Sequence, residues 1–476
     1  MLLNQDFLLS ALPKAKFYCS GAELAHQAAW TFYASGKEVS AFFDSRVVEQ
    51  DGLFFALNGQ TVDGHDFVAQ SLKNGVAAIV VNRLDCLKGL EVSDRLIILV
   101  DDTTQALIDM AKAWRARLTC PVVGITGSIG KTSTKEILRS ILVSAGIQAH
   151  LSSKNQNTLL SLCTNILGVK TSCQAVVLEV GIDRTGEMAL KADILRPTIA
   201  IITTVSYSHI KYFGNLHNIG FEKRQIFKNL GGSGVGIIPG DLPMLDNVCY
   251  GHPTARFGFK TKNSVQARKV EVVSDENGQA FITFTLKWYG QKVPIKFNTI
   301  HRGMLNNALA ASSVAYFLHV PIEALKEGLE SYTAFENRFE QRKLKDFNGF
   351  VISDCYNANP ESMKAAILAF DSIKTSATKI AVIGDMLELG SREVYWHRFI
   401  GKLLNKSSSV EKVVLVGDLV RYVAGMLPDE MILAKVDTWQ EAEPILRMVL
   451  AKKQYFVLVK ASLGIALYKL VDKLTK

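Results

Sequence analysis

The segment PVVGITGSIGKTSTK, from Pro121 to Lys135, has the pattern of a phosphate-binding loop. An apolar run is followed by glycines three residues apart, and Gly130-Lys131-Thr132 then begins a helical pattern. In such a loop the glycines let backbone N–H groups face a polyphosphate, and the next helix points its positive end at the same anion. Lys131 is then expected to reach the β- and γ-phosphates, and Thr132 to bind magnesium.

The loop differs from the common phosphate-loop template at one position. That template has a glycine five residues before the second glycine, where this chain has Ile125, so the motif is the variant TGxxGKT. The alternative is a glycine-rich turn that binds no ligand. A Gly-Lys-Thr sequence placed after a strand and before a helix favours the phosphate-binding interpretation.

Two further apolar runs end in residues that could bind a metal. The run from Ala175 to Val180 carries Glu179 near its end, and the run from Thr198 to Val205 leads to Ser208-His209. Ligands of open parallel sheets gather at the carboxyl ends of the strands, where both features fall. Taken singly, Glu179 fits a surface carboxylate and His209 a core histidine; together with the loop they indicate a site.

The length of 476 residues predicts about three domains, which we place at 1–118, 119–336 and 337–476. Each alternates apolar runs with helical patterns, so the fold class is α/β with mostly parallel sheets. Alternating apolar and polar residues between Gly231 and Asn298 predict antiparallel hairpins inserted in the second domain. In the third unit we expect strands at 349–353, 379–383, 413–416 and 455–459, and an alanine-rich helix at 306–316 precedes that unit.

Composition excludes several classes of protein. The net charge is +9, but basic and acidic residues are interspersed and no nucleic-acid module is recognisable. Seven cysteines are scattered singly, as expected of reduced core thiols. We find no signal peptide and no apolar run long enough for a membrane span, so we expect a cytoplasmic protein without membrane insertion.

The first domain contains Asp44-Ser45-Arg46 just before an apolar run. A hydroxyl and a guanidinium in one loop could hold a diphosphate. The same residues are also typical of turns, and the segment alone does not decide between these interpretations.

Taken together, the motifs resemble the Mur ligases, ATP-dependent amide-forming enzymes of peptidoglycan precursor synthesis. The resemblance spans nearly the whole chain, including DSRVVEQDGLFFALNGQTVDGHDF, which is similar to the UDP-sugar-binding domain of the family. DCYNANPES and GDMLELG, without any DNPR, are most similar to the member that adds D-Ala-D-Ala to UDP-N-acetylmuramoyl tripeptide. The resemblance implies a small α/β UDP-substrate domain, a central P-loop ATPase domain and a C-terminal Rossmann-like domain.

The resemblance also implies roles for individual residues. Catalytic roles are implied for Lys131, Lys223, His209 and Arg338. ATP contacts are implied for Thr126, Gly127, Ser128, Gly130, Lys131, Thr132, Asn307, Arg338 and Asp354. Two magnesium ions are implied, bound by Thr132, Glu179, His209 and a carbamylated Lys223, whose oxygen donors suit a hard cation better than an ammonium would. Contacts to the substrates are implied for Ser45, Arg46, Asn155, Asn157, Tyr356, Asn357 and Asn359.

The implied reaction passes the γ-phosphoryl group of ATP to the terminal carboxylate of the UDP-muramoyl tripeptide, and the amine of D-Ala-D-Ala then displaces phosphate. A related ligase with another acceptor, a diamino acid or glutamate, is one alternative. A nucleotide-binding scaffold that does not ligate is another, because His301–Met304 and Lys460–Leu463 depart from the family pattern. We expect a monomer; the sequence leaves open whether the third residue of the accepted peptide is meso-diaminopimelate or lysine.

Overall fold

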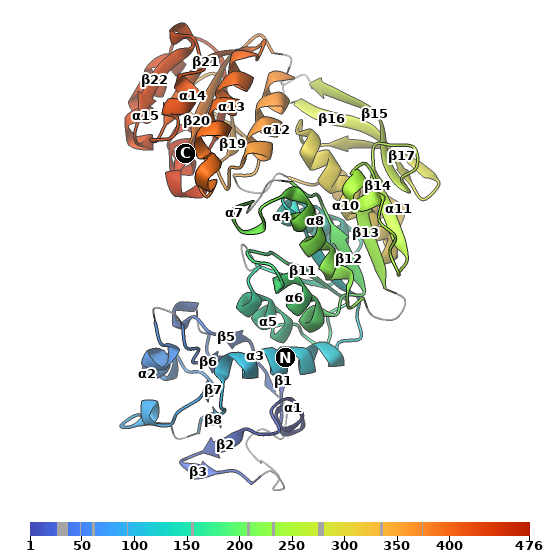
Figure 1. The fold of residues 1–476 in the computed structure, drawn as a ribbon, viewed down its shortest axis with the longest axis vertical. Coiled ribbons are helices and arrows are strands. Elements are labelled where there is room, and N and C mark those ends of the chain that lie inside the picture. Colours follow the sequence, from blue (N-terminus) through green and yellow to red (C-terminus); the bar gives the residue numbers. More distant parts are fainter. Residues whose placement is uncertain are drawn as a thin grey trace.

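The computed structural model describes residues 1–476 except 26–36, 48, 60–61, 93, 154–156, 207–209, 231–233, 275–279, 334–336 and 374. Three sheets follow one another along the chain and form an elongated molecule (Figure 1). Within the described residues they have six, nine and six strands, and a two-stranded ribbon is added near the start of the chain. The predicted three-domain α/β architecture is therefore confirmed.

The first sheet has the strand order β3-β2-β8-β7-β6-β5, with β5 to β8 parallel and β2 antiparallel to its neighbours. Its last helix, α3 (Thr103–Arg117), joins it to the central domain, because Trp114 donates a hydrogen bond to the Val169 carbonyl and Arg115 to the Leu195 carbonyl. The other elements are β1 (Leu2–Leu3), α1 (Gln5–Ala11), β2 (Lys16–Cys19), β3 (Ala22–Glu23), β4 (Lys37–Glu38), β5 (Ala41–Phe42), β6 (Leu53–Phe55), α2 (Val68–Lys73), β7 (Ala78–Val81) and β8 (Leu96–Leu99).

The central sheet has the order β10-β11-β9-β12-β13-β14-β15-β16-β17. The strands from β10 to β15 in this order are parallel, and β15, β16 and β17 are antiparallel. Its strands are β9 (Val122–Thr126), β10 (Ala149–Leu151), β11 (Ala175–Glu179), β12 (Ile199–Ile202), β13 (Val235–Pro239), β14 (Thr254–Gly258), β15 (Val265–Ser274), β16 (Ala280–Trp288) and β17 (Gln291–Phe297).

The expected hairpins between Gly231 and Asn298 are only partly confirmed. Strands β15 to β17 form them, but β13 and β14 continue the parallel sheet, and the hairpins extend that same sheet. All five residues of β13 are buried, which fits a parallel strand covered on both faces. Alternating burial, the signature of the hairpins, is found in β17.

Helices cover both faces of the central sheet. The predicted apolar face of α4 is confirmed, because Ile137, Leu138, Ile141 and Leu142 are at most 1% exposed and pack with α10 and α11. The expected alanine-rich helix at 306–316 lies inside α10. The helices are α4 (Lys131–Ser144), α5 (Leu159–Leu167), α6 (Glu187–Leu195), α7 (Ile210–Phe213), α8 (Leu216–Arg224), α9 (Pro243–Asp246), α10 (Arg302–Phe317) and α11 (Ile322–Glu330).

The third sheet has the order β18-β19-β23-β20-β21-β22, parallel except for β18. The four predicted strands are confirmed as β19, β20, β21 and β23, whereas the edge strands β18 and β22 were not foreseen. The elements are β18 (Glu340–Lys343), β19 (Gly349–Asp354), α12 (Pro360–Asp371), β20 (Thr378–Gly384), α13 (Glu393–Asn405), β21 (Val410–Val416), α14 (Arg421–Ala424), β22 (Ile432–Val436), α15 (Trp439–Leu450), β23 (Tyr455–Lys460) and α16 (Leu467–Thr475).

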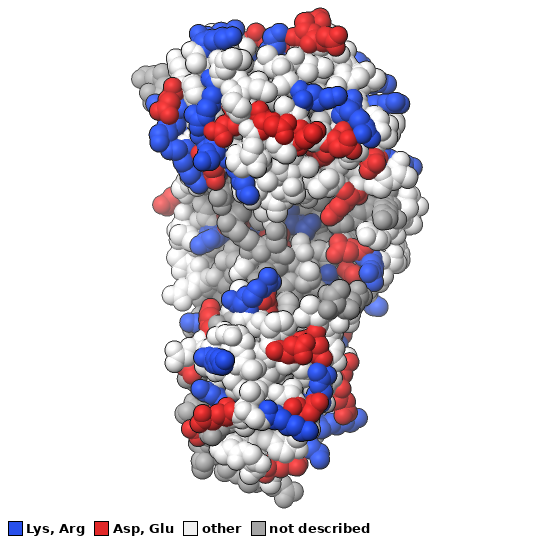
Figure 2. Space-filling model, turned by 90° about the vertical axis from the view of Figure 1, so that its left-hand side faces the viewer, with Lys and Arg blue, Asp and Glu red and all other residues white. Residues whose placement is uncertain are grey.

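Charged side chains are mixed over the face shown in Figure 2, where basic and acidic groups alternate along the long axis of the molecule. This distribution agrees with the interspersed charges of the sequence. Among the described helices, none combines the length and apolar character needed to cross a bilayer.

Candidate active site

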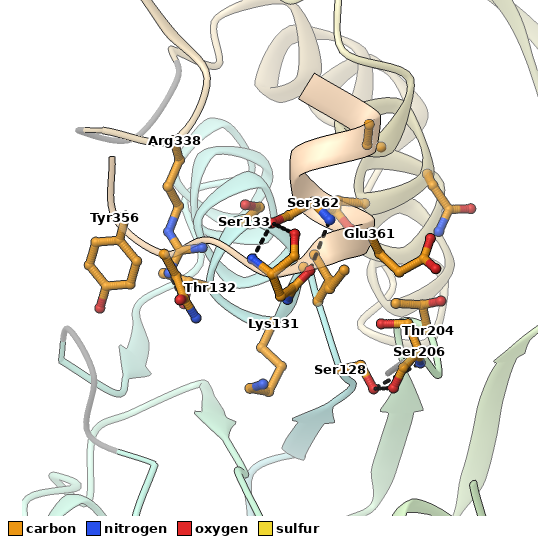
Figure 3. A pocket seen from close by; sticks show the side chains of 18 of the residues that line it. Ser128, Lys131, Thr132, Ser133, Thr204, Ser206, Arg338, Tyr356, Glu361 and Ser362 are labelled. Atoms are coloured by element: carbon orange, nitrogen blue, oxygen red, sulfur yellow. Dashed lines mark hydrogen bonds between the residues drawn. The ribbon is translucent and has the colours of Figure 1, made fainter. Parts of the chain in front are cut away.

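A cavity of about 720 Å³ lies where the central and third domains meet (Figure 3). The central domain contributes the phosphate loop, the ends of β11 and β12, and the first turns of α10. The third domain contributes the end of β19 and the first turn of α12. The volume falls in the range typical of small-molecule sites, so the cavity can hold a nucleotide together with a small acceptor.

The phosphate loop is fixed to the end of β12. Thr203 donates a hydrogen bond from Oγ1 to the Ile129 carbonyl at 2.6 Å, and the Ser128 N–H donates to the Thr204 carbonyl at 2.9 Å. Gly130 caps α4 in the left-handed region, at φ 89°, and leads directly into the helix. The loop is therefore preorganised, with the positive end of α4 at the cavity wall.

Substitution of Gly130 by alanine is expected to weaken nucleotide binding. A Cβ at this position would lie 2.3 Å from Asn307 Oδ1, and the left-handed backbone adds strain of about 1–2 kcal/mol. Both effects displace the loop from α10. The dissociation constant for ATP, measured by calorimetry, should rise at least about tenfold, which corresponds to about 1.4 kcal/mol. An unchanged constant would show that the loop does not need this conformation.

Thr132, Glu179 and Arg338 form one polar chain at the cavity wall. Thr132 Oγ1 donates to Glu179 Oε2 at 2.9 Å, and Arg338 Nη2 donates to Thr132 Oγ1 at 3.2 Å. The Arg338 guanidinium also lies over the Tyr356 ring, 3.9 Å from its centre. Glu179 is 2% exposed, so a carboxylate and a hydroxyl are held together in a dry corner of the cavity. These hard oxygen donors fit a magnesium ion bound beside a phosphate.

Two lysines from different helices line the same cavity. Lys131 Nζ donates to the Gly127 carbonyl at 2.8 Å, and Lys223, near the end of α8, is 2% exposed. Burial lowers the pKa of Lys131. Burial, and then the charge of Lys131, lower the pKa of Lys223 well below its usual value. Deprotonation of Lys223 therefore costs less in the folded protein than deprotonation of an ordinary lysine.

The third domain presents Asp354 to the cavity through a buried ion pair. Lys460 Nζ lies 2.6 Å from Asp354 Oδ2 and also donates to the Asn357 carbonyl at 3.1 Å. The Phe339 N–H donates to Asp354 Oδ1 at 3.2 Å. Sequence reasoning gave Lys460 no role. The signal that could have found it is its place at the end of β23, next to the end of β19, since neighbouring parallel strands share one carboxyl edge.

Replacing Lys460 with methionine should destabilise the third domain. The Lys460 side chain is fully buried and that of Asp354 is 16% exposed, so the substitution leaves a largely buried carboxylate without its cation. The loss should be about 3 kcal/mol in the free energy of unfolding, measured in urea. A loss below about 1 kcal/mol would mean that solvent compensates Asp354, as at a surface pair.

The NANP segment, Asn357 to Pro360, leads into α12 at the cavity. Asn359 caps the helix, because its Oδ1 accepts a hydrogen bond from the Ser362 N–H at 2.9 Å, and the Asn359 N–H donates to Ser362 Oγ at 3.1 Å. Asn357 lines the cavity with Asn359. The cap is a structural role for Asn359, and the positive end of α12 still faces the cavity.

His301, which also lines the cavity, caps α10. Its Nδ1 accepts a hydrogen bond from the Met304 N–H at 3.3 Å, and its ring packs edge-on against Phe339, 4.6 Å between ring centres. Burial lowers the pKa of His301 to about 4, so the ring is neutral at physiological pH, as its acceptor role requires. His301, Met304 and Asn307 line the cavity, and the contact of His301 with Phe339 joins the central domain to the third domain.

Several predicted site residues lie elsewhere. Ser45 and Arg46 belong to a short 3₁₀ helix, Ser45–Val47, in the first domain; Arg46 is 86% exposed and forms an ion pair with Asp44 at 2.6 Å. Thr126 is buried at the end of β9 and does not line the cavity. His209 and Asn155 lie outside the described residues. The cavity is lined by these predicted residues: Ser128, Gly130, Lys131, Thr132, Asn157, Glu179, Lys223, Asn307, Arg338, Asp354, Tyr356, Asn357 and Asn359.

The cavity combines a phosphate loop, buried oxygen donors suited to magnesium, and a third α/β domain that lies against them. Together these features define a nucleotide-dependent ligase site. Sequence comparison gives its family. This chain belongs to the Mur ligase family. The family's catalytic domain matches residues 42–115, the Mur ligase middle domain matches 125–315, and the glutamate ligase domain matches 337–463.

Individual relatives specify the branch of the family. The chain is 34% identical over 434 residues to UDP-N-acetylmuramoyl-tripeptide–D-alanyl-D-alanine ligase of Bacillus subtilis, covering 90% of this chain and 92% of the relative. Its structure is similar to that of MurF from Acinetobacter baumannii, with a TM-score of 0.83 and 25% identity over 100% and 99% of the two chains. It is also similar to MurF ligase from Thermotoga maritima in complex with ADP, with a TM-score of 0.78 and 27% identity over 92% and 97%.

Proposed function

We propose that the chain is an ATP-dependent ligase that joins D-Ala-D-Ala to UDP-N-acetylmuramoyl tripeptide and yields the UDP-muramoyl pentapeptide. The observation that carries the proposal is the shared cavity, in which the phosphate loop of one domain faces the NANP segment of another. The names of the relatives in Bacillus subtilis and other bacteria supply the two substrates. The diamino acid and glutamate alternatives are not favoured.

ATP binds with its phosphates on the loop. The N-terminus of α4, which follows Gly130, faces the phosphates, and Lys131 turns from the Gly127 carbonyl toward them. Arg338, already 3.2 Å from Thr132 Oγ1, neutralises the γ-phosphoryl group as it is transferred. Asn307 and Asp354 contact the nucleoside part of ATP. These contacts position the phosphoryl group for attack by the tripeptide carboxylate.

Magnesium fits the buried pair of Thr132 and Glu179, with His209 and carbamylated Lys223 as proposed ligands of a second ion. Bound magnesium supplies charge neutralisation at the phosphates. The low pKa of Lys223 supports carbamylation, because only a neutral amine reacts with carbon dioxide. Addition of carbon dioxide to the neutral amine, with release of one proton, would give an anionic oxygen donor close to Lys131.

The acceptor dipeptide enters from the side of the third domain. The positive end of α12, with Asn357 and Asn359 beside it, attracts the carboxylate of D-Ala-D-Ala, while its amine faces the phosphate loop. The neutral amine attacks the acyl phosphate carbon, the C–N bond forms, and the C–O bond to phosphate breaks as the nitrogen loses its proton. Positioning of the two reactants supplies much of the rate, since little covalent chemistry is asked of the protein.

The remaining proposals concern the UDP end and the state of the protein. The first domain, with Ser45 and Arg46, binds the UDP-sugar; Arg46 is free to move from Asp44 because it is exposed. Asn155, Asn157 and Tyr356 contact the peptide stem. Domain limits at 118 and 336, a monomeric state and a cytoplasmic location stay predictions.

A phosphate-release assay tests the function directly. The protein is incubated with ATP, magnesium and UDP-muramoyl tripeptide, and then with D-Ala-D-Ala, meso-diaminopimelate, glutamate or no acceptor. Release that depends on the dipeptide is expected. Release that depends on another acceptor would move the chain to another branch of the family, and ATP binding without release would identify a scaffold.

A further inference from the structure

We propose that Lys135 is a positioning residue, which holds Glu179 in the orientation that magnesium requires and so sets the magnesium affinity of the site. The inference rests on the proposed function, because it takes Thr132 and Glu179 as magnesium ligands. No role for Lys135 followed from the motif, in which Lys131 is the phosphate-binding lysine.

Lys135 is buried inside the protein, and three oxygen atoms lie close to its ammonium group. It is 1% exposed, and its Nζ donates to the Ser152 carbonyl at 2.6 Å. It also lies 3.1 Å from Glu179 Oε1 and 3.2 Å from Glu136 Oε1. Of these three contacts the one to Ser152 is a hydrogen bond, and the two to the carboxylates are ion pairs. Lys135 does not line the cavity, so its ammonium faces Glu179 from the interior of the protein.

The two carboxylate oxygens of Glu179 therefore have separate partners. Oε2 accepts from Thr132 Oγ1 at 2.9 Å, on the side of the cavity, whereas Oε1 faces Lys135 in the interior. The Glu179 N–H donates to Ser152 Oγ at 3.1 Å, so Ser152 contacts both the lysine and the glutamate. The three residues join α4 to the ends of β10 and β11. This arrangement fixes the carboxylate plane and leaves Oε2 for an ion beside Thr132.

The position of Lys135 in α4 explains how one helix holds both the phosphate-binding lysine, Lys131, and the lysine that positions Glu179. Residues four apart lie on the same helix face, so Lys131 and Lys135 point to the same side, one turn apart. Lys131 lines the cavity, and Lys135 lies behind Glu179. A 2%-exposed carboxylate needs a compensating cation in the folded protein. Supplying that cation from behind leaves the front of Glu179 open to a metal.

The test is a magnesium titration of the full chain with Lys135→Met, which keeps the length of the side chain and removes its charge and donors. Magnesium is added to the protein with a non-hydrolysable ATP analogue, and the rise in Tm is followed. The midpoint of the titration should lie about 10–100-fold higher than in the wild type, the usual effect of losing a partner behind a metal ligand. In the ligation assay, kcat should recover in part at saturating magnesium. A midpoint equal to that of the wild type would overturn the proposal.

Lys379→Met is a matched control for the loss of a buried ammonium. Lys379 is 3% exposed in the third domain, where its Nζ donates to the Phe370, Asp371 and Ile373 carbonyls and to Ser409 Oγ. This variant should lose stability but keep the wild-type magnesium midpoint. If both variants shift the midpoint equally, the effect is one of general stability and the proposal fails.

If Lys135→Met does not fold, Ser152→Ala tests whether the orientation of Glu179 sets the magnesium affinity. It removes the hydroxyl that accepts from the Glu179 N–H and leaves the carbonyl that accepts from Lys135. A midpoint raised about threefold or more supports the positioning role, and an unchanged one opposes it. Wild-type protein that binds the analogue without any response to magnesium would overturn the inference and the metal assignment together. A normal titration without dipeptide-dependent phosphate release would refute only the proposed ligation.

Discussion

Lys131→Met should lower kcat for dipeptide-dependent phosphate release by about 10²–10³-fold, which corresponds to about 2.7–4 kcal/mol of transition-state stabilisation. The methionine side chain fills the same space but cannot stabilise the charge that develops on the transferred phosphoryl group. In the structure Lys131 Nζ makes a hydrogen bond to the Gly127 carbonyl, a neutral partner within its own loop. Little of the effect should therefore arise from lost stability.

Two measurements separate this catalytic role from a structural one. The Tm of Lys131→Met should stay within a few degrees of the wild type, since one hydrogen bond contributes about 1 kcal/mol. Lys131→Arg keeps the charge and should retain more activity than the methionine variant. If the methionine variant keeps wild-type kcat, Arg338 and the helix N-terminus alone neutralise the phosphates, and the role given to Lys131 is wrong.

Lys223→Ala is expected to lower kcat by about 10²–10³-fold and to recover activity in the presence of short-chain carboxylic acids. The alanine variant leaves a space in the cavity wall, where a small carboxylate can replace the two oxygens of the carbamate. Recovery should rise with the concentration of formate or acetate and saturate. Wild-type activity should show no such response.

The control for this rescue is Lys191→Ala. Lys191 is 3% exposed and its Nζ donates to the Gly181 carbonyl at 2.8 Å, close to the cavity but with a structural partner. Carboxylic acids should not restore whatever activity this variant loses. Full activity of Lys223→Ala, without any added acid, would rule out an essential carbamate at this position.

The sequence by itself determined the fold class and most of the strand-end site. The TGxxGKT loop, the buried run before Glu179 and the NANP segment each combine local structure with chemistry, because each follows a strand directly. Since parallel strands present their carboxyl ends at one edge of a sheet, the order of the elements already placed these residues near one another. The parallel course of β13 and β14 was missed, because a short buried run looks the same in parallel and antiparallel sheets.

Only the tertiary structure decided which side chains share a partner. The contacts of Arg338 with Thr132, of Lys460 with Asp354, and of Lys135 with Glu179 join residues 206, 106 and 44 positions apart. Burial has effects of the same kind. It lowers the pKa of Lys223, and it makes the loss of the cation beside Asp354 costly in free energy of unfolding. A sequence shows which residues can ionise. How far each is removed from water, and which charge compensates it, depends on the packing of the folded chain.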